Sequence, residues 1–166
     1  MKFDDEDKEG IVDYKETPRQ LVASAQGFGS FEEVIRAMME LFRWVLINGG
    51  KVASYPLARY PDIPESPRRE AGSFEVCVPI EDGIRDEGDV KIKSIPGITV
   101  AYSRHLGSLE DIHETYSRIL KWIEENGFEL EGTSREIYLT SPLQDEVKDL
   151  VTEVQIPVGR PPGSIH

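Results

Sequence analysis

The sequence has few of the residues that build disulfides and metal clusters. Among its 166 residues are one cysteine and three histidines. The single cysteine, Cys77, excludes an internal disulfide and a cysteine-based zinc cluster, and it is expected to be a half-buried strand residue. His105, His113 and His166 lack metal-ligand spacing, so packing roles are favoured for the first two and a tail position for the third. No metal and no cofactor are predicted.

Long apolar runs and catalytic motifs are also missing. No segment approaches the roughly 20 apolar residues that a transmembrane helix needs. The first residues, Met1 to Asp7, are acidic and unlike a secretory signal, so a cytoplasmic protein without membrane contact is expected. There is no glycine-rich phosphate loop, nucleophile elbow or Ser–His–acid set, and no catalytic residue is predicted from a motif.

Positive charge is scarce relative to negative charge. The chain has 19 basic and 31 acidic residues and a formal net charge of −12. Such a surface repels phosphate backbones, so direct nucleic-acid binding is not expected. It would concentrate cationic small molecules, although solubility is its usual consequence.

An internal repeat organises the chain. A shift of 78 positions aligns residues 10–80 with residues 88–158 without a gap, and 17 of the 71 pairs are identical. The identities fall in several separate blocks that all share the same shift, which is not expected by chance. The clearest blocks are Gly29-Ser30 with Gly107-Ser108, Trp44 with Trp122, Asn48-Gly49 with Asn126-Gly127, Tyr60 with Tyr138, and Glu75-Val76 with Glu153-Val154.

Each repeat predicts a strand, a long helix and two further strands. The helix follows a Gly-Ser step, where Ser30 or Ser108 is a suitable N-cap, and it ends at an Asn-Gly pair. Apolar residues recur at helical spacing, so both helices are amphipathic and lie on a sheet. Strands are expected near residues 21–25, 56–60 and 74–80, and near 98–102, 136–139 and 152–158; loops are expected at 61–69 and 81–88.

This order of elements predicts an α+β fold. It consists of a duplicated strand–helix–strand–strand module, with about eight strands and two long helices packed on one face. One module of about 70 residues would leave a sheet flank open and bury a small core. The two repeats therefore form one domain over residues 10–158, with flexible tails at 1–9 and 159–166. A ligand cleft is expected at their pseudo-twofold interface, because such interfaces are favoured sites.

The second repeat carries a family resemblance. The stretch Pro96–Tyr102, the helix ending at Asn126-Gly127, the strand Glu136-Ile137-Tyr138-Leu139 and the segment Thr152–Val158 occur in an order that resembles the GyrI-like small-molecule-binding domain. The resemblance covers about Asp13–Val158. That domain has a SOUL-like fold and is the effector-binding half of AraC-type and MerR-type bacterial regulators. The resemblance implies a pocket between the repeats for drug-like molecules that are often aromatic and cationic.

The strand around Glu136 is the main candidate site. The resemblance implies an acidic residue at the pocket floor, which matches Glu136 with Tyr138 beside it. Strand alternation places these two side chains on one face and Ile137 on the other. We expect Ile137 to face the helices, and Glu136 and Tyr138 to point the opposite way, into the cleft or into water.

Comparison of the repeats adds three aromatic candidates. Tyr60 is equivalent to Tyr138, Tyr102 replaces a serine of the first repeat, and Trp122 lies off the centre of its helical stripe. Each is a candidate ligand contact, and a structural role is the alternative for Tyr102 and Trp122. Glu75 and Glu153 could add charge to the cleft, although structural ion pairing is favoured.

Three functions remain open from the sequence. The first is a stand-alone protein, without a DNA-binding domain, that binds amphipathic aromatic and mostly cationic small molecules. Glu136 would supply charge, and Tyr138, Tyr60, Tyr102 and Trp122 would supply ring contacts. The second is a hydrolase of electrophilic small molecules, in which Glu136 activates water and Tyr138 assists. The third is an inhibitor module that binds a protein partner, as gyrase-inhibiting relatives imply. The oligomeric state is not predicted.

Overall fold

The computed structural model describes residues 10–61, 72–140 and 150–159. The expected tail 1–9, residues 160–166 of the expected tail 159–166, including His166, and most of the expected loop 61–69 lie outside this range. The described residues form two helices and one antiparallel sheet of nine strands, which confirms the predicted α+β class. Neither helix is long and apolar enough to cross a membrane.

The elements follow one another in an order that the repeat largely anticipated. The first half contains β1 (Asp13–Glu16), β2 (Gln20–Gly29), α2 (Phe31–Ile47), β3 (Leu57–Tyr60) and β4 (Gly72–Pro79). The second half contains β5 (Lys91–Ile95), β6 (Thr99–Leu106), the 3-10 turn η1 (Leu109–Asp111), α3 (Ile112–Glu125), β7 (Glu129–Leu130), β8 (Ser134–Tyr138) and β9 (Val151–Gly159).

Three short strands were not expected, and one boundary was wrong. β1 and β7 have no clear alternation of their own, whereas Lys91-Ile92-Lys93 of β5 does alternate and was missed; all three pair with longer strands that the pattern did predict. Gly159, expected in a flexible tail, ends β9 and lies opposite Glu129 of β7. Backbone pairing can therefore extend a sheet with residues whose side chains give no strand signal.

The helix ends follow from local chemistry. Ser108 accepts a hydrogen bond from the Glu110 N–H at 3.1 Å, so it caps η1, which continues into α3. Ser30 occupies the N-cap of α2 without a side-chain cap bond. Gly49 and Gly127, with φ of 78° and 74°, end the two helices as the Asn-Gly pairs predicted.

The sheet order is β1-β6-β9-β8-β3-β4-β2-β5, with β7 paired to β9. The pairings repeat after a shift of 78 positions: Val22 lies opposite Pro79, and Val100 lies opposite Pro157. β1 pairs with β6, and β5 pairs with β2, so the first strand of each half pairs with a strand of the other half. The connections between β1 and β2 and between β5 and β6 meet at Thr17, whose N–H donates to the Ile98 carbonyl at 2.8 Å.

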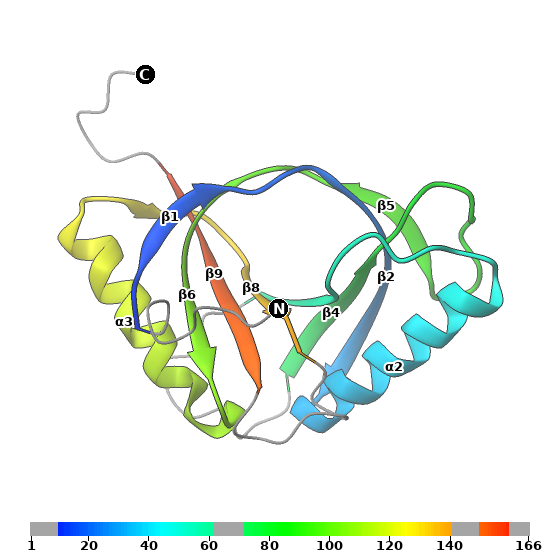
Figure 1. The fold of residues 1–166 in the computed structure, drawn as a ribbon, viewed down its shortest axis with the longest axis horizontal. Coiled ribbons are helices and arrows are strands. Elements are labelled where there is room, and N and C mark those ends of the chain that lie inside the picture. The colour runs from blue at the N-terminus through cyan, green and yellow to red at the C-terminus, as the bar shows by residue number, and fades with distance from the viewer. Residues whose placement is uncertain (1–9, 62–71, 141–149, 160–166) are drawn as a thin grey trace.

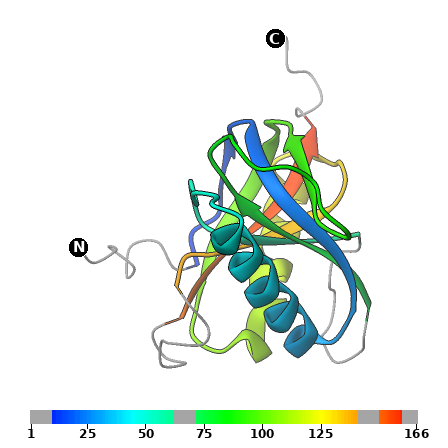
Figure 2. The same ribbon diagram turned by 90° about the vertical axis from the view of Figure 1, so that its right-hand side faces the viewer.

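Both helices pack on one face of the sheet, which we call the helix face. α2 contacts β2 and β4, and α3 contacts β6 and β9 (Figure 1). Figure 2 shows α2 lying across the strands of its own half. The other side, which we call the opposite face, lies beneath the two crossing connections in Figure 1.

Each helix covers its own apolar cluster. Under α2 this includes Val34, Leu41, Val76 and Val78, and under α3 it includes Ile119, Ile123, Val154 and Ile156. A third cluster, of Val22, Leu57, Cys77 and Ile95, with Ile137 packed against it, lies on the opposite face. The opposite face of the central strands is therefore largely buried too: Leu57 and Cys77 are buried there, whereas Arg59 and Ile137 are half-buried.

Candidate ligand-binding site

Glu136 lies at the centre of the sheet, where the two halves meet. It stands directly opposite Ala58 in the ladder between β3 and β8, and these two positions are related by the shift of 78. A second glutamate at position 58 would place like charges directly opposite each other, which destabilises a sheet. The alanine leaves space for one carboxylate.

Two tyrosine hydroxyls donate to this carboxylate. Glu136 has 0% of its surface exposed. The Tyr116 hydroxyl, from α3, donates to Oε2 at 2.7 Å, and the Tyr138 hydroxyl, from β8, donates to Oε1 at 3.0 Å. Hydrogen bonds to an ionised group are roughly twice as strong as neutral ones, so this pair fixes the carboxylate in place.

Further rings extend the arrangement toward the first half of the chain. The hydroxyls of Tyr60 and Tyr138 are 3.3 Å apart, and the Phe31 ring of α2 meets Tyr138 edge-on with centroids 6.3 Å apart. Tyr138 gives its proton to Glu136, so Tyr60 donates to Tyr138. We call Glu136, Tyr116, Tyr138 and Tyr60 the tyrosine–glutamate cluster.

The side chains of this cluster point toward the helices, which corrects the sequence-based expectation. Tyr116 of α3 reaches Glu136, and Tyr138 belongs to the apolar cluster under α2. Ile137 packs on the opposite face, beside Leu57 and Cys77. The alternation was right but the faces were exchanged, because the opposite face is also buried and needs apolar residues of its own.

Two other predicted contacts are not brought to the cluster. Tyr102 lies on the opposite face, where Lys15 Nζ sits 4.1 Å from its ring centroid. Burial, followed by Asp13 and Glu153, raises the pKa of Tyr102. Trp122 stacks on Phe128 with centroids 5.3 Å apart, on the flank of α3. Neither ring belongs to the tyrosine–glutamate cluster.

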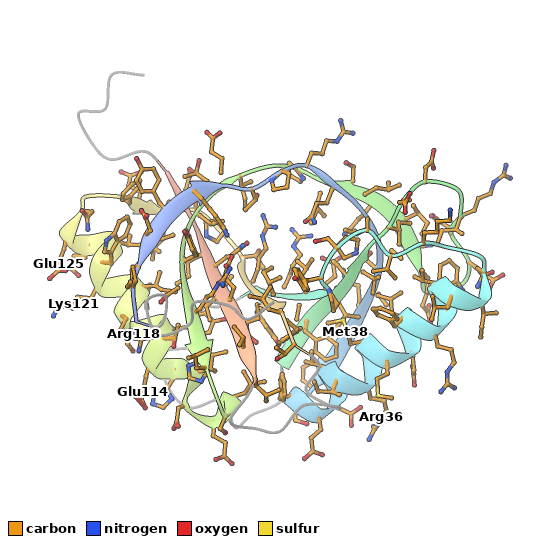
Figure 3. All side chains as sticks on the ribbon, viewed as in Figure 1. Arg36, Met38, Glu114, Arg118, Lys121 and Glu125 are labelled. Atoms are coloured by element: carbon orange, nitrogen blue, oxygen red, sulfur yellow. The ribbon has the colours of Figure 1, made fainter. Side chains whose placement is uncertain are left out.

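Sequence reasoning placed Tyr116 only in the apolar stripe of its helix. Its equivalent in the first half is Met38, which Figure 3 shows on the inner side of α2, with Arg36 on the outer side. The signal in the sequence was a tyrosine at the centre of one helical stripe, where the other repeat has a methionine. It indicates a polar partner buried beneath the helix.

The opposite face holds paired charges. Arg59 Nη1 donates to Glu75 Oε1 at 2.8 Å, and Lys93 Nζ lies 2.5 Å from Glu75 Oε2. Lys15 Nζ donates to Glu153 Oε2 at 2.7 Å. The structure confirms that Glu75 and Glu153 serve in ion pairs, and neither carboxylate reaches the helix face.

His105 and Cys77 have structural positions. His105 Nε2 donates to the Ser108 carbonyl at 2.7 Å, and its Nδ1 lies 2.8 Å from Thr115 Oγ1. Burial raises the pKa of the Cys77 thiol to about 12. Within the described ranges, no group of three or more His, Cys, Asp or Glu side chains could hold a metal ion.

This fold and this buried carboxylate define the class of protein. The chain belongs to the GyrI-like small-molecule-binding domain family, whose family model matches residues 12–159. No curated protein sequence matches it. The predicted family is thereby confirmed.

Solved structures with the same fold include a domain of EcmrR and a hydrolase. The C-terminal domain of EcmrR has a TM-score of 0.81 and 24% identity, over 90% of this chain and 98% of that domain. In the EcmrR–DNA complex the match covers 57% of the longer EcmrR chain.

A hydrolase encoded by lin2189 from Listeria innocua has a TM-score of 0.70 and 11% identity, over 92% of this chain and 93% of that one. SAV2435, solved bound to tetraphenylphosphonium, has a TM-score of 0.54 and 11% identity, over 90% of this chain and 94% of that one.

Proposed function

We propose that this domain binds amphipathic aromatic cations at the tyrosine–glutamate cluster. The observation that carries the proposal is the fully buried Glu136 carboxylate, held by two tyrosine hydroxyls at the centre of the sheet. Membership of a small-molecule-binding family supports a small ligand of some kind. The cation preference is our inference from the site.

The preference for cations rests on the negative charge of the Glu136 carboxylate, which is buried away from water. A carboxylate among aromatic rings has lost most of its hydration, so it attracts a cation more strongly than it would in water. The faces of Tyr60, Tyr138 and Phe31 add cation–π attraction and apolar contact. A neutral ligand of the same shape gains the contact area without the charge interaction.

A ligand reaches Glu136 only when covering side chains move aside. Met38 is 9% exposed and belongs to the same apolar cluster as Tyr60 and Tyr138. Its unbranched thioether side chain adapts readily to a new neighbour. Phe31 at the start of α2 is only partly buried. We propose that these two residues of α2 open the site.

The first experiment is calorimetric titration with a matched pair of probes. Tetraphenylphosphonium is chosen because a protein of the same fold was solved with it. Triphenylphosphine oxide serves as the neutral aromatic analogue. The wild type should bind the cation at least about tenfold more tightly, a difference of about 1.4 kcal/mol.

Matched variants assign the preference to Glu136. Glu136→Gln keeps the shape and removes the charge, so the cation should lose its advantage while the neutral probe binds about as before. Glu125→Gln removes the same charge from the exposed side of α3, labelled in Figure 3, and should change neither affinity. Equal affinity of the wild type for both probes would reject the proposal, and so would an equal loss in both variants.

A second candidate function is hydrolysis at the same cluster. Tyrosine hydroxyls 2.7 and 3.0 Å from the carboxylate would let Glu136 activate water and Tyr138 assist at an electrophilic centre. A protein of the same fold is described as a hydrolase. Incubation with electrophilic aromatic esters and epoxides, followed by product analysis, separates the two functions: a binder returns its ligand unchanged. The inhibitor module remains a prediction that a protein-capture experiment would test.

A further inference from the structure

A second charged centre lies on the opposite face, directly behind the tyrosine–glutamate cluster. Arg59 of β3 and Arg135 of β8 stand opposite each other in the ladder that also pairs Ala58 with Glu136. Side chains of such a pair lie on the same face, a few ångström apart. Arg135 and Glu136 are consecutive residues, so they serve opposite faces of one strand.

Arg135 is a buried cation without a counterion in the part of the chain that the structure describes. It is 4% exposed, and none of the described residues forms a hydrogen bond or ion pair with its side chain. The nearby carboxylate of Glu75 already pairs with Arg59 and Lys93. Among the described residues, Arg59 and Lys93 therefore have this counterion, whereas Arg135 does not.

The neighbouring strand contributes a buried unsatisfied polar atom. Gln155 of β9 lies opposite Arg135. Its Nε2 donates to Glu153, whereas its Oε1 is buried and has no hydrogen-bond partner among the described residues. Buried polar groups are nearly always satisfied in folded proteins, so this oxygen calls for an explanation.

A cavity opens at this point. It has a volume of about 460 Å³, and both arginines line it together with Thr99, Thr133, Pro157 and Glu131. That volume accommodates a small organic anion with accompanying water. Threonine hydroxyls beside two guanidinium groups provide hydrogen-bond donors, while the exposed Glu131 repels anions at the rim.

The arginine is not explained by packing. In the first half of the chain the equivalent of Arg135 is Leu57, which is buried in the apolar cluster of the same face. An aliphatic residue at this register position is therefore compatible with the fold. Leaving a charge buried without a partner costs several kcal/mol. Burial, followed by repulsion from Arg59, lowers the pKa of Arg135 to about 10, so the side chain is still charged at pH 7.

We propose that Arg135 and Arg59 form a binding site for a small oxyanion, a carboxylate or a phosphate group, in this cavity. Guanidinium groups bind both oxyanions through paired N–H···O bonds, and a bound anion would neutralise the buried charge of Arg135. The site is separate from the tyrosine–glutamate cluster, because the two occupy opposite faces of the sheet. It does not depend on the function proposed above.

The test measures anion binding to the whole chain by titration calorimetry and thermal unfolding. The probes are inorganic phosphate and succinate, each against chloride at equal ionic strength, because screening alone changes both readouts. Saturable binding and a rise in Tm are expected with at least one oxyanion and with no equivalent effect of chloride. A response to phosphate alone or to succinate alone identifies the preferred class.

Three variants assign the binding. Arg135→Leu installs the residue of the first half; it should fold, lose at least tenfold in oxyanion affinity, and lose the Tm rise. Glu131→Gln should tighten binding by about twofold or more, because it removes a repelling charge at the rim. Arg43→Gln removes one positive charge from the exposed side of α2 and should have no effect.

Two results would overturn the proposal. One is a wild type that shows no saturable binding of either oxyanion up to the order of 10 mM, equivalent to less than about 3 kcal/mol of binding free energy. The other is an Arg135→Leu variant that binds as the wild type does. If Arg135→Leu fails to fold, Arg135→Lys, which keeps the charge without the planar fork, must weaken oxyanion binding for the proposal to stand.

Discussion

At the scale of single residues, two neighbours in the chain carry opposite charges to opposite faces of one strand. The Glu136 carboxylate is held by tyrosine hydroxyls beneath the helices, and Arg135 lines a cavity on the other side. A strand separates them because successive side chains alternate. The central strand β8 can therefore serve two sites of opposite charge preference.

Removing the Tyr116 hydroxyl should destabilise the protein. Tyr116→Phe keeps the ring, which is 0% exposed, and leaves Oε2 of Glu136 without this donor. We expect a loss of about 1.5–3 kcal/mol in the free energy of unfolding, measured by urea denaturation. Tyr14→Phe, at a ring that is 54% exposed, should change stability by less than about 0.5 kcal/mol. Equal effects of the two changes would contradict the role of this hydrogen bond.

The Cys77 thiol should be unreactive in the native protein. Burial raises its pKa to about 12, so at pH 8 the reactive thiolate is roughly one part in ten thousand. Iodoacetamide should label the chain only in denaturant, as mass spectrometry would show. Fast labelling of the folded protein at pH 8 would contradict this placement.

At the scale of elements, β4 and β9 carry the glutamates that hold the opposite face together. Glu75 of β4 ties β3 to β5 through Arg59 and Lys93, and Glu153 of β9 binds Lys15 of β1. These ion pairs reach across strands that are distant in sequence. They stabilise the curved sheet where apolar side chains alone do not fill the face.

Neutralising Glu75 should destabilise the fold far more than neutralising a surface glutamate. Glu75→Gln leaves Arg59 and Lys93 near Arg135 without their shared carboxylate. We expect a loss of about 1.5–3 kcal/mol in the free energy of unfolding, because charge-assisted hydrogen bonds of the half-buried Arg59 and Lys93 to a buried carboxylate are lost. Glu33→Gln breaks the exposed ion pair with Arg36 and should cost at most about 1 kcal/mol. Urea denaturation of both variants measures the difference, and similar costs would refute the buried role.

At the scale of the whole molecule, the two halves are joined by exchanged strands. β1 of the first half pairs with β6 of the second, β5 of the second pairs with β2 of the first, and β3 pairs with β8 between them. Separating the halves would break all three ladders and leave each half with exposed sheet edges. One domain over residues 10–158 remains a prediction, and these connections favour it.

Neither half should fold alone. Fragments 10–87 and 88–159 should each lack cooperative thermal unfolding in circular dichroism, and an equimolar mixture should recover a sheet-rich spectrum and a single transition. The reason is that each half lacks one flanking strand and the central ladder of the sheet. A fragment that unfolds cooperatively by itself would show that the domain divides into two independent units.

Much of the architecture follows from local pattern. The apolar stripes of α2 and α3, the Asn-Gly helix ends and the long strands β2, β4, β6 and β9 each have a signal within a few residues. The short strands β1 and β7 do not, because short flanking strands can be formed by backbone pairing with a neighbour rather than by their own side chains. About eight strands were expected and six of them were placed, whereas the sheet has nine.

The candidate site divides in the same way. The sequence alone determined that Glu136, Tyr138 and Tyr60 belong together, because strand alternation and the repeat constrain them. Only the tertiary structure decided which face they occupy, that Tyr116 joins them while Tyr102 and Trp122 do not, and that Arg59 and Arg135 meet behind them. The physical reason is that alternation reports which side chains share a face, whereas which of two buried faces receives the helices depends on how the whole sheet curves and pairs.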